Sequence, residues 1–407
     1  EFNGSMTSRV YEDGVDVTVS GDLLGTFVGD EQRGVGVSTE IPVFLGGGYA
    51  FFSMIYSNES SGETLTFKYY SSVLDEILDI GTTVGFESDM TLGDATDPYV
   101  LEIMTDIDAN IELSGGWNWL SLNLYTDDMS LNNVLAGLED GSATYIKSAT
   151  AFADYYSGYG WYGQLSASGI NNTEMYKLFL NYSEVLEFTG APVDVTETVI
   201  EISPGWNWIG YTPQVPLSIN FALSNIDVLE GGEYIKGQAG FADYYSGYGW
   251  YGQLATMSPF LGYQIYVNSN DEFTYPEGEG LSRTDEDDKD YKVNPTLWEV
   301  NPHDYEFNGS ITAQVKIENQ NIDSENFLLA AFEGDECVGV AKADKFPLND
   351  LYVFGLMMHN NKENAKVDFK VYDIDNDNYI DLKQSLTFYS DMKEGNALMP
   401  IILTSAS

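Results

Sequence analysis

The residues best suited to chemistry are aromatic rings gathered in a segment that occurs twice. The sequence FADYYSGYGWYGQL stands at 152–165 and again, unchanged, at 241–254. Such rings combine an apolar face with polar groups nearby, so a sugar can stack on a ring while its hydroxyls bond to amides and carboxylates. The candidate glycan-binding residues are Asp154, Tyr155, Tyr156, Tyr159, Trp161, Tyr162 and Gln164 in the first copy, and Asp243, Tyr244, Tyr245, Tyr248, Trp250, Tyr251 and Gln253 in the second.

The same segment also has a purely structural interpretation. Gly158, Gly160 and Gly163 interrupt any continuous pleat, as expected where the backbone bends closely around large rings. Two recently duplicated copies would also be identical without any functional reason. The sequence therefore leaves open whether these rings bind a ligand or build the fold.

An acidic stretch near the C-terminus is a candidate calcium site. Asp373, Asp375, Asp377, Tyr379 and Asp381 place oxygen atoms at alternate positions. Calcium takes roughly six to eight oxygen ligands, which a turn of this kind can supply. The stretch lacks the glycine and the final glutamate of an EF-hand loop, so a solvated acidic hairpin is the alternative.

Catalytic constellations are not evident. The chain has two histidines, His303 and His359, which are too few for a histidine metal cluster or for two separate histidine-based sites. With 64 acidic residues, some pair of carboxylates always lies within range, and no motif selects one. The sequence predicts that the protein is not an enzyme.

Charge and composition restrict the partners. The 407 residues carry a net charge of −47, which repels phosphate backbones and anionic lipid. No apolar run is long enough for a membrane span, so neither nucleic-acid binding nor membrane insertion is expected. A single cysteine, Cys337, excludes an internal disulfide framework. A salty extracellular or cell-surface setting fits best, with polysaccharide or other copies of the chain as partners.

Internal repeats define the organisation. GWNW recurs at 116–119 and 205–208, in register with the aromatic segment, and EFNGS recurs at 1–5 and 306–310. The predicted order is A-B-B-A, with module A1 at 1–107, B1 at 108–196, B2 at 197–280, an acidic linker at 281–294 and A2 at 295–407.

The expected fold is mostly β, an array of antiparallel β-sandwich modules in which each B module has one short helix. Segments such as 15–21, 49–57 and 63–70 have strand composition. Gly-Asp pairs such as Gly29-Asp30 and Gly334-Asp335 are predicted to form hairpin turns between strands of the A modules. The helix of B1 is predicted at 130–140. After Trp117, period-two alternation places Leu120, Leu122 and Leu124 on a core face and the two indoles on the opposite face, where the aromatic segment is the expected cover.

One difference between the A modules suggests a means of assembly. A2 is preceded by PTLWEVNPHDY at 295–305, and A1 has no such lead-in. If the lead-in is a strand, A1 has an open sheet edge that a neighbouring molecule can complete. The alternative is that the chain was simply cut there.

The B modules, with GWNW, then YIKS or YIKG, then the aromatic segment and LGYQIYV at 261–267, resemble the GWN-type β-repeats of secreted modular surface proteins common in Bacteroidetes. The A modules, with FVGDE and FEGDE, look like companion β-sandwich domains. The resemblance implies an exported, surface-attached or released protein without assigned activity. We therefore expect a non-catalytic extracellular repeat protein, an adhesin or surface filament or scaffold. The alternatives are a carbohydrate-binding module array and a fibre subunit assembled by strand donation.

Overall fold

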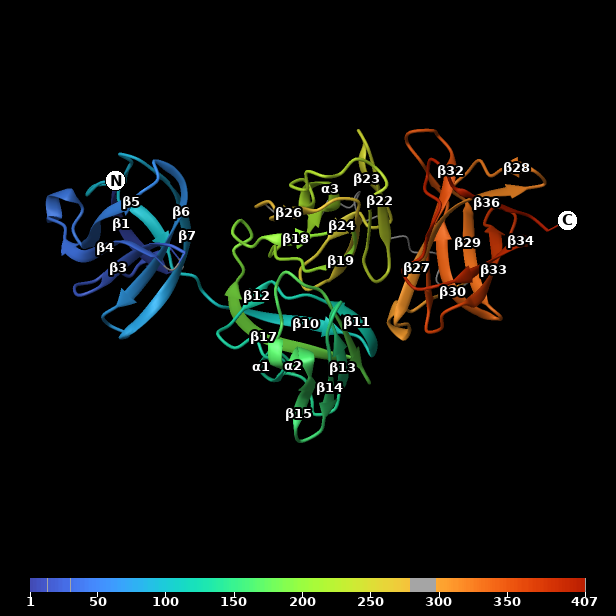
Figure 1. The fold of residues 1–407 in the computed structure, drawn as a ribbon, viewed down its shortest axis with the longest axis horizontal. Helices are drawn as coiled ribbons and strands as arrows, with labels where there is room; N and C mark the ends of the chain where they lie inside the picture. The colour runs from blue at the N-terminus through green and yellow to red at the C-terminus, as the bar shows by residue number, and fades with distance from the viewer. Residues whose placement is uncertain (13, 30, 279–297, 407) are drawn as a thin grey trace. The chain divides into compact units, whose positions relative to one another are not determined.

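The computed structural model describes residues 1–12, 14–29, 31–278 and 298–406, and the linker predicted at 281–294 lies outside them. The chain forms two compact units, Glu1–Ile107 and Asp108–Ser407. Strands account for 54% of the structure and helices for 5%, which confirms the prediction of a mostly β, multi-domain fold (Figure 1). None of the helices in these ranges has the length and apolar character needed to cross a membrane.

The first unit is a strongly paired β structure with its own core. Its elements are β1 (Phe2–Glu12), β2 (Val15–Asp16), β3 (Leu23–Val28), β4 (Glu31–Glu40), η1 (Val43–Leu45), β5 (Tyr49–Ser57), β6 (Ser61–Ser71), β7 (Glu76–Glu87), β8 (Thr91–Leu92) and β9 (Tyr99–Glu102). The strand order is β2-β1-β5-β4-β3-β6-β7, with β8 and β9 paired in parallel to β1. Alternate residues of β6, Leu65, Phe67 and Tyr69, face the core as period two requires. Of the strand predicted at 15–21, the structure keeps Val15–Asp16 alone.

The A2 region repeats this plan as two sheets. Its elements are η2 (Pro302–Asp304), β27 (Phe307–Ile317), β28 (Gln320–Asn321), β29 (Phe327–Glu333), β30 (Glu336–Lys342), β31 (Asp344–Lys345), β32 (Tyr352–Asn360), β33 (Ala365–Asp373), β34 (Asn378–Phe388), β35 (Lys393–Glu394) and β36 (Ile401–Thr404). One sheet has the order β28-β27-β32-β31 and the other β30-β29-β33-β34. The predicted hairpin turn at Gly334-Asp335 is confirmed, since Glu333 pairs with Glu336 and Gly334 has φ +63°.

Each B region is built around a five-stranded antiparallel sheet. In B1 the elements are β10 (Ile107–Leu113), β11 (Gly116–Leu120), β12 (Leu124–Tyr125), α1 (Leu131–Val134), β13 (Ala143–Lys147), β14 (Phe152–Tyr156), β15 (Gly160–Gly163), α2 (Gln164–Ser168), β16 (Tyr176–Leu180) and β17 (Glu184–Pro192). In B2 they are β18 (Ile200–Ile202), β19 (Gly205–Ile209), β20 (Leu217–Ser218), α3 (Ile219–Ala222), β21 (Tyr234–Lys236), β22 (Phe241–Tyr245), β23 (Gly249–Gly252), β24 (Thr256–Met257), β25 (Tyr263–Val267) and β26 (Asp271–Phe273). The sheets have matching orders, β11-β16-β13-β14-β15 and β19-β25-β21-β22-β23.

The prediction of one short helix in each B module is wrong for B1. The helix expected at 130–140 shrinks to α1, which ends at Val134 and is followed by turns. At Gly137 the chain approaches β17 so closely that a Cβ atom would lie 2.7 Å from the Glu187 carbonyl oxygen. A second helix, α2, begins at Gln164, inside the aromatic segment. In B2 the residues that follow Gly252 form no helix.

The alternation predicted for the GWNW strand is confirmed on its apolar side, where Leu120, Leu122 and Leu124 lie in the B1 core. On the other face Trp117 packs edge-on against Tyr145 and Phe179 of the neighbouring strands. Trp119 lies beneath two lysines, described below. The cover over these indoles therefore differs from the prediction, because it comes from neighbouring strands and lysines.

The described part of the lead-in before A2 is not a strand. Residues 298–305 contain the short helix η2, and Trp298 packs edge-on against Phe332, Tyr372 and Tyr379. In the first unit, β1 has partners on both sides, with β5 on one and β8 and β9 on the other. Strand donation into A1 requires that the lead-in is a strand and that β1 has an open edge. The described residues show neither feature.

Candidate functional site

The two copies of the aromatic segment fold into the same hairpin. In B1, β14 pairs with β15, and in B2, β22 pairs with β23 in the corresponding register. Gly160 has φ +87°, and a Cβ atom there would lie 2.4 Å from the side-chain oxygen of Asn132. That oxygen accepts a hydrogen bond from the Trp161 backbone N–H at 3.0 Å, and Asn220 does the same for Trp250 at 2.8 Å. The glycine and the asparagine thus fix the hairpin against the body of each module.

The tryptophans of the two segments belong to the cores. Trp161 is 7% exposed and Trp250 is 4% exposed, and each packs edge-on against the tyrosine of its own hairpin, Tyr155 or Tyr244, at 5.3 Å between ring centres. Neither indole has a free face on which a sugar can stack. For the two tryptophans, of the two interpretations left open by the sequence, this burial favours the structural one, in which each indole anchors its hairpin.

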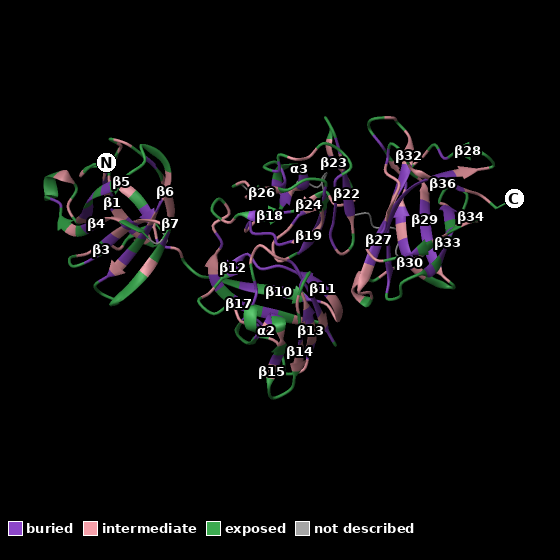
Figure 2. Cartoon of the chain, in the orientation of Figure 1, coloured by how far each residue is buried: buried purple, intermediate pink, exposed green. Residues whose placement is uncertain are grey.

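The remaining tyrosines of the B1 hairpin stand in solvent. Tyr156 is 52% exposed, Tyr162 is 77% exposed and Tyr159 is 93% exposed. Figure 2 shows the tip of this hairpin as an exposed region. Asp154 is half-buried and Gln164 exposed, while the Tyr155 hydroxyl donates to Asp140 at 2.7 Å. In B1, the predicted site residues that remain accessible are therefore mainly these three rings.

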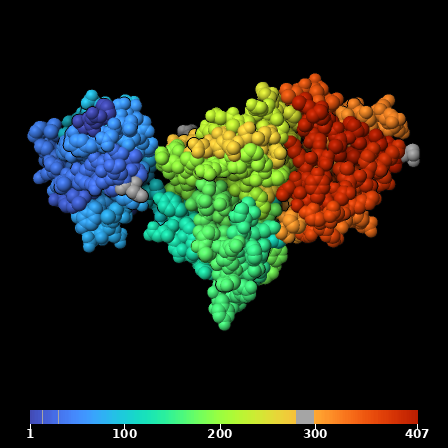
Figure 3. Space-filling model, viewed as in Figure 1, coloured from blue at the N-terminus to red at the C-terminus, as the bar shows by residue number. Residues whose placement is uncertain are grey.

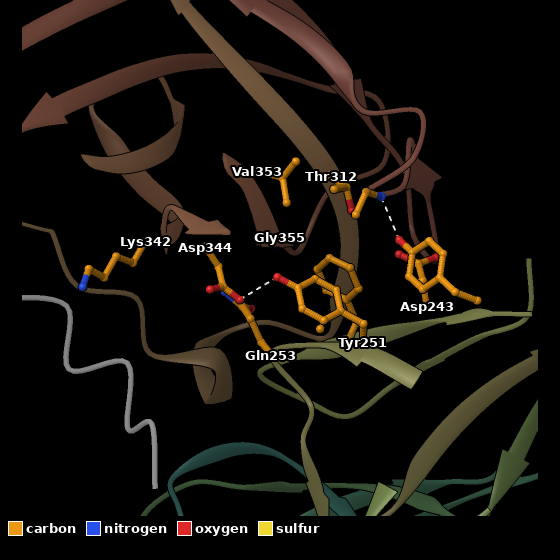
Figure 4. Close-up of a pocket in the computed structure, with 12 residues that line it drawn as sticks. Asp243, Tyr251, Gln253, Thr312, Lys342, Asp344, Val353 and Gly355 are labelled. Carbon is orange, nitrogen blue, oxygen red and sulfur yellow. Dashed lines mark hydrogen bonds between the residues drawn. The ribbon is translucent and has the colours of Figure 1, made fainter. Parts of the chain in front are cut away.

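In B2 the same tyrosines contact the A2 region. Tyr245 and Tyr251 both lie 4.9 Å from the ring of Phe346, and Tyr245 is 6% exposed. The Tyr251 hydroxyl donates to Asp344 at 2.6 Å, and the Tyr245 hydroxyl accepts from the Ala397 backbone N–H at 2.7 Å (Figure 4). The lining of a cavity of about 30 Å³ between these elements includes Gln253, Thr312, Lys342, Val353 and Gly355. Residues of the A2 region already contact these rings, so the B2 segment is not an open ligand site.

Charged groups are buried in the same contact. Asp243 is 4% exposed and forms an ion pair with Lys393 at 2.8 Å. Burial raises the pKa of Asp243, and the lysine partly offsets that effect. Lys236 is fully buried and donates to Asn308 Oδ1 at 2.8 Å and to Asp391 at 2.6 Å. Burial also lowers the pKa of Lys236, while Asp391 opposes the shift.

A group of lysines over indole rings was not predicted from the sequence. Lys177 Nζ lies 4.4 Å from the centre of the Trp119 ring and 5.1 Å from that of Trp208, and Lys236 Nζ lies 5.0 Å from that of Trp206. Lys177 also donates to the Glu306 carbonyl at 3.1 Å, and Lys147 forms an ion pair with the Glu306 carboxylate. Burial, aided by repulsion from Lys236, lowers the pKa of Lys177 to about 7. The repeated YIK sequence, at 145–147 and 234–236, is the signal that could have indicated Lys147 and Lys236, whereas nothing in the sequence singles out Lys177.

The two histidines have structural contacts. His303 Nδ1 lies 2.6 Å from the Trp117 carbonyl oxygen, and His359 Nε2 donates to the Gln238 carbonyl at 3.0 Å. Burial lowers the pKa of His359 to about 4. Within the described ranges, no three or more His, Cys, Asp or Glu side chains are grouped so that they could hold a metal ion.

The candidate calcium stretch forms the β33–β34 hairpin. Its carboxylates are engaged by neighbouring side chains: Asp373 with Asn376, Asp375 with Asn326, Asp377 with Tyr372, and Asp381 with Lys370. Tyr379 packs against Tyr372 at 4.8 Å between ring centres. Asp373 ends β33, Asp375 and Asp377 lie in the turn and Asp381 belongs to β34, and each carboxylate is engaged by a different neighbour. The solvated hairpin describes this stretch better than the calcium site.

Comparison of the chain with protein-family models, with curated proteins and with solved structures gave no match in any of the three.

Proposed function

We propose that this protein is a non-catalytic segment of an extracellular repeat protein, an adhesin or surface filament, whose B modules use an aromatic hairpin to fix a neighbouring A module. The observation that carries the proposal is the burial of the B2 hairpin on the A2 region. The anchors there, Tyr245, Tyr251 and Phe346, are large aromatic side chains of the kind that dominate protein interfaces.

Buried polar contacts support a fixed geometry for this interface. The Tyr234 hydroxyl donates to Ser310 at 2.6 Å, and the Asn308 amide donates to the carbonyls of Gly237 and Gln238 at 3.2 and 3.0 Å. A shifted orientation would leave these groups and Lys236 buried without partners, which costs about 1–3 kcal/mol for each neutral group. Such contacts specify one orientation, as a load-bearing or ligand-presenting array requires.

The charge supports an extracellular setting for the proposal. A net charge of −47 keeps the chain soluble and apart from other polyanions, and salt reduces its self-repulsion because the Debye length falls to roughly 8 Å at physiological ionic strength. Surface labelling of the producing cells with an antibody to the chain checks this location. Labelling confined to permeabilised cells would contradict it.

The structural role is tested by unfolding single molecules under force. We expect B2 and A2 to unfold in one event, and the variant Phe346→Ala to separate it into two events because the hairpin loses its main anchor. Leu348→Ala, a change at a 50% exposed residue two positions away, is the matched control and should leave the single event intact. Separate B2 and A2 events in the unaltered chain would contradict the proposed role.

A further inference from the structure

The B1 hairpin leaves bare the surface that B2 uses to bind A2. Phe152 is 48% exposed, whereas its counterpart Phe241 is 2% exposed and belongs to a buried cluster with Tyr234 and Met357. Tyr159 is the most exposed ring of the B1 hairpin, at 93%. Figure 3 shows this hairpin as a green projection at the lower end of the second unit. The hairpin rings that form an interface in B2 are therefore uncovered in B1, whereas Lys147 beside them is paired with Glu306 of A2.

The A1 module keeps the polar groups that receive a B module in A2. In A2, Asn308, Ser310 and Asp391 accept hydrogen bonds from Lys236 and Tyr234. The motifs FNGS and SDM, shared by the two A modules, place the same residue types in A1, at Asn3, Ser5 and Asp89. Asn3 and Asp89 are exposed in A1 and Ser5 is half-buried, whereas Asn308 and Ser310 are buried in A2.

The strand beside these groups is apolar and exposed. The pairing of β1 with β5 places Phe52, Met54 and Tyr56 opposite Thr7, Ser5 and Asn3. The same register in A2 places Gly355, Met357 and His359 opposite Thr312, Ser310 and Asn308. Met357 and His359 are 3% and 5% exposed, whereas Phe52, Met54 and Tyr56 are 47%, 44% and 57% exposed. Alternate residues share one face of a strand, so these three side chains form an uncovered apolar row.

We propose that this A1 face of one molecule binds the B1 hairpin of a second copy of the chain, using the ring contacts by which the B2 hairpin binds A2. Tyr145 of B1 takes the place of Tyr234, and the exposed hairpin rings Phe152, Tyr156 and Tyr162 take the places of Phe241, Tyr245 and Tyr251. Lys147 keeps its ion pair with Glu306 of A2, so it has no part in the new contact. The proposal rests on the proposed structural function and names the partner of its hairpin. Because the two surfaces differ, the contact is head-to-tail and can propagate from molecule to molecule.

One substitution makes the new contact weaker than its counterpart within the chain. In A2 a Cβ atom on Gly355 would lie 3.3 Å from the Phe241 ring, so that ring covers the glycine closely. A1 has Phe52 at this position, and its ring must lie beside Phe152 instead of beneath it. The result is a reversible contact that depends on protein concentration, in place of a permanent one.

Sedimentation velocity of the full chain over a concentration series tests the proposal. We expect the average mass to rise with concentration beyond that of a dimer. Tyr159→Ser/Tyr162→Ser on the hairpin, or Phe52→Ser/Tyr56→Ser on the A1 face, should each leave monomers. An equimolar mixture of the two variants should form a heterodimer and nothing longer, because each retains one functional surface. Ile77→Ser, at a 69% exposed residue on β7, is the control and should associate like the unaltered chain.

Several results would overturn the proposal. These are monomers at every concentration, association that survives both double variants, or a mixture of the variants that remains monomeric. Binding to a polysaccharide panel through Tyr159 and Tyr162, in a chain that stays monomeric, would assign the hairpin to glycans instead. The force experiment on B2 and A2 is made on single molecules, so its outcome is independent of self-association and tells the two proposals apart.

Discussion

The two aromatic hairpins have one sequence and two environments. Tyr156 is 52% exposed in B1 and its counterpart Tyr245 is 6% exposed in B2, and for Tyr159 and Tyr248 the values are 93% and 43%. Both tryptophans, in contrast, are buried to a similar degree. Identical residues thus build identical hairpins, and the presence of an A module decides which rings become an interface. The local sequence determines that the tryptophans anchor each hairpin, whereas the neighbouring module determines whether the tyrosines are exposed or form an interface.

The largest expected effect is one that the two copies share. Trp161→Ala and Trp250→Ala should each lower the free energy of unfolding by about 3–5 kcal/mol, because each leaves a cavity in a module core. Chemical denaturation followed by circular dichroism measures both. A Trp161→Ala variant as stable as the unaltered chain would show that the B1 indole is not an anchor and would break the equivalence of the hairpins.

Sequence reasoning succeeded where the outcome depends on local pattern. The strand at 49–57, the turn at Gly334-Asp335 and the leucine face after Trp117 follow from alternation and turn chemistry, and the structure has all three. These features depend on residues within a few positions of one another along the chain.

The candidate site was less predictable because its contacts are remote. Tyr251 meets Asp344 across 93 positions and Tyr245 meets Ala397 across 152, and a repeat comparison places neither pair together. The lysines over the indoles were missed for the same reason, since Lys177 and Trp208 come from different modules. The alternation of side chains along a strand also does not indicate whether its outer face is exposed to solvent or covered by another module.

The next largest difference in the free energy of unfolding is expected between the two equivalent lysines, Lys236 of β21 and Lys147 of β13. Lys236→Met should cost about 3 kcal/mol or more, because it leaves Asp391 and Asn308 without their buried partner. Lys147→Met should cost about 1 kcal/mol or less, since that side chain is 20% exposed and its ion pair with Glu306 is screened by solvent. Urea denaturation of both variants provides the measurement. Equal losses would mean that B1 and B2 depend on A2 to the same extent.

The equivalent tyrosines Tyr245 and Tyr156 test whether contact with A2 makes the same ring more important for stability in B2 than in B1. Tyr245→Ala should lower the free energy of unfolding by about 2–3 kcal/mol through lost packing on Phe346 and an unsatisfied Ala397 N–H. Tyr156→Ala, the same change in the same sequence context, should alter it by about 0.5 kcal/mol or less. Parallel thermal and urea unfolding of the two variants decides between these values. A large loss for Tyr156→Ala would show that the B1 ring is already covered in the monomer.

Acid should reduce the difference between the two hairpins, because His359 lies in the B2–A2 contact. Its folded-state pKa is lowered to about 4 from 6.5, so the unfolded chain binds the proton first. The stability associated with neutral His359 is therefore complete above pH 6.5 and is lost as the pH falls toward 4, by an amount on the order of 3 kcal/mol. The protonated ring also lies near Lys236, which adds repulsion.

The variant His359→Gln isolates the contribution of this histidine from that of the carboxylates, which titrate in the same pH range. Glutamine keeps a side-chain N–H, so the informative quantity is the difference in stability between the unaltered chain and the variant. We expect the variant to lose less stability between pH 6.5 and 4, as measured by urea denaturation at each pH. Identical pH profiles would exclude His359 as the group through which acid loosens the B2 hairpin from A2.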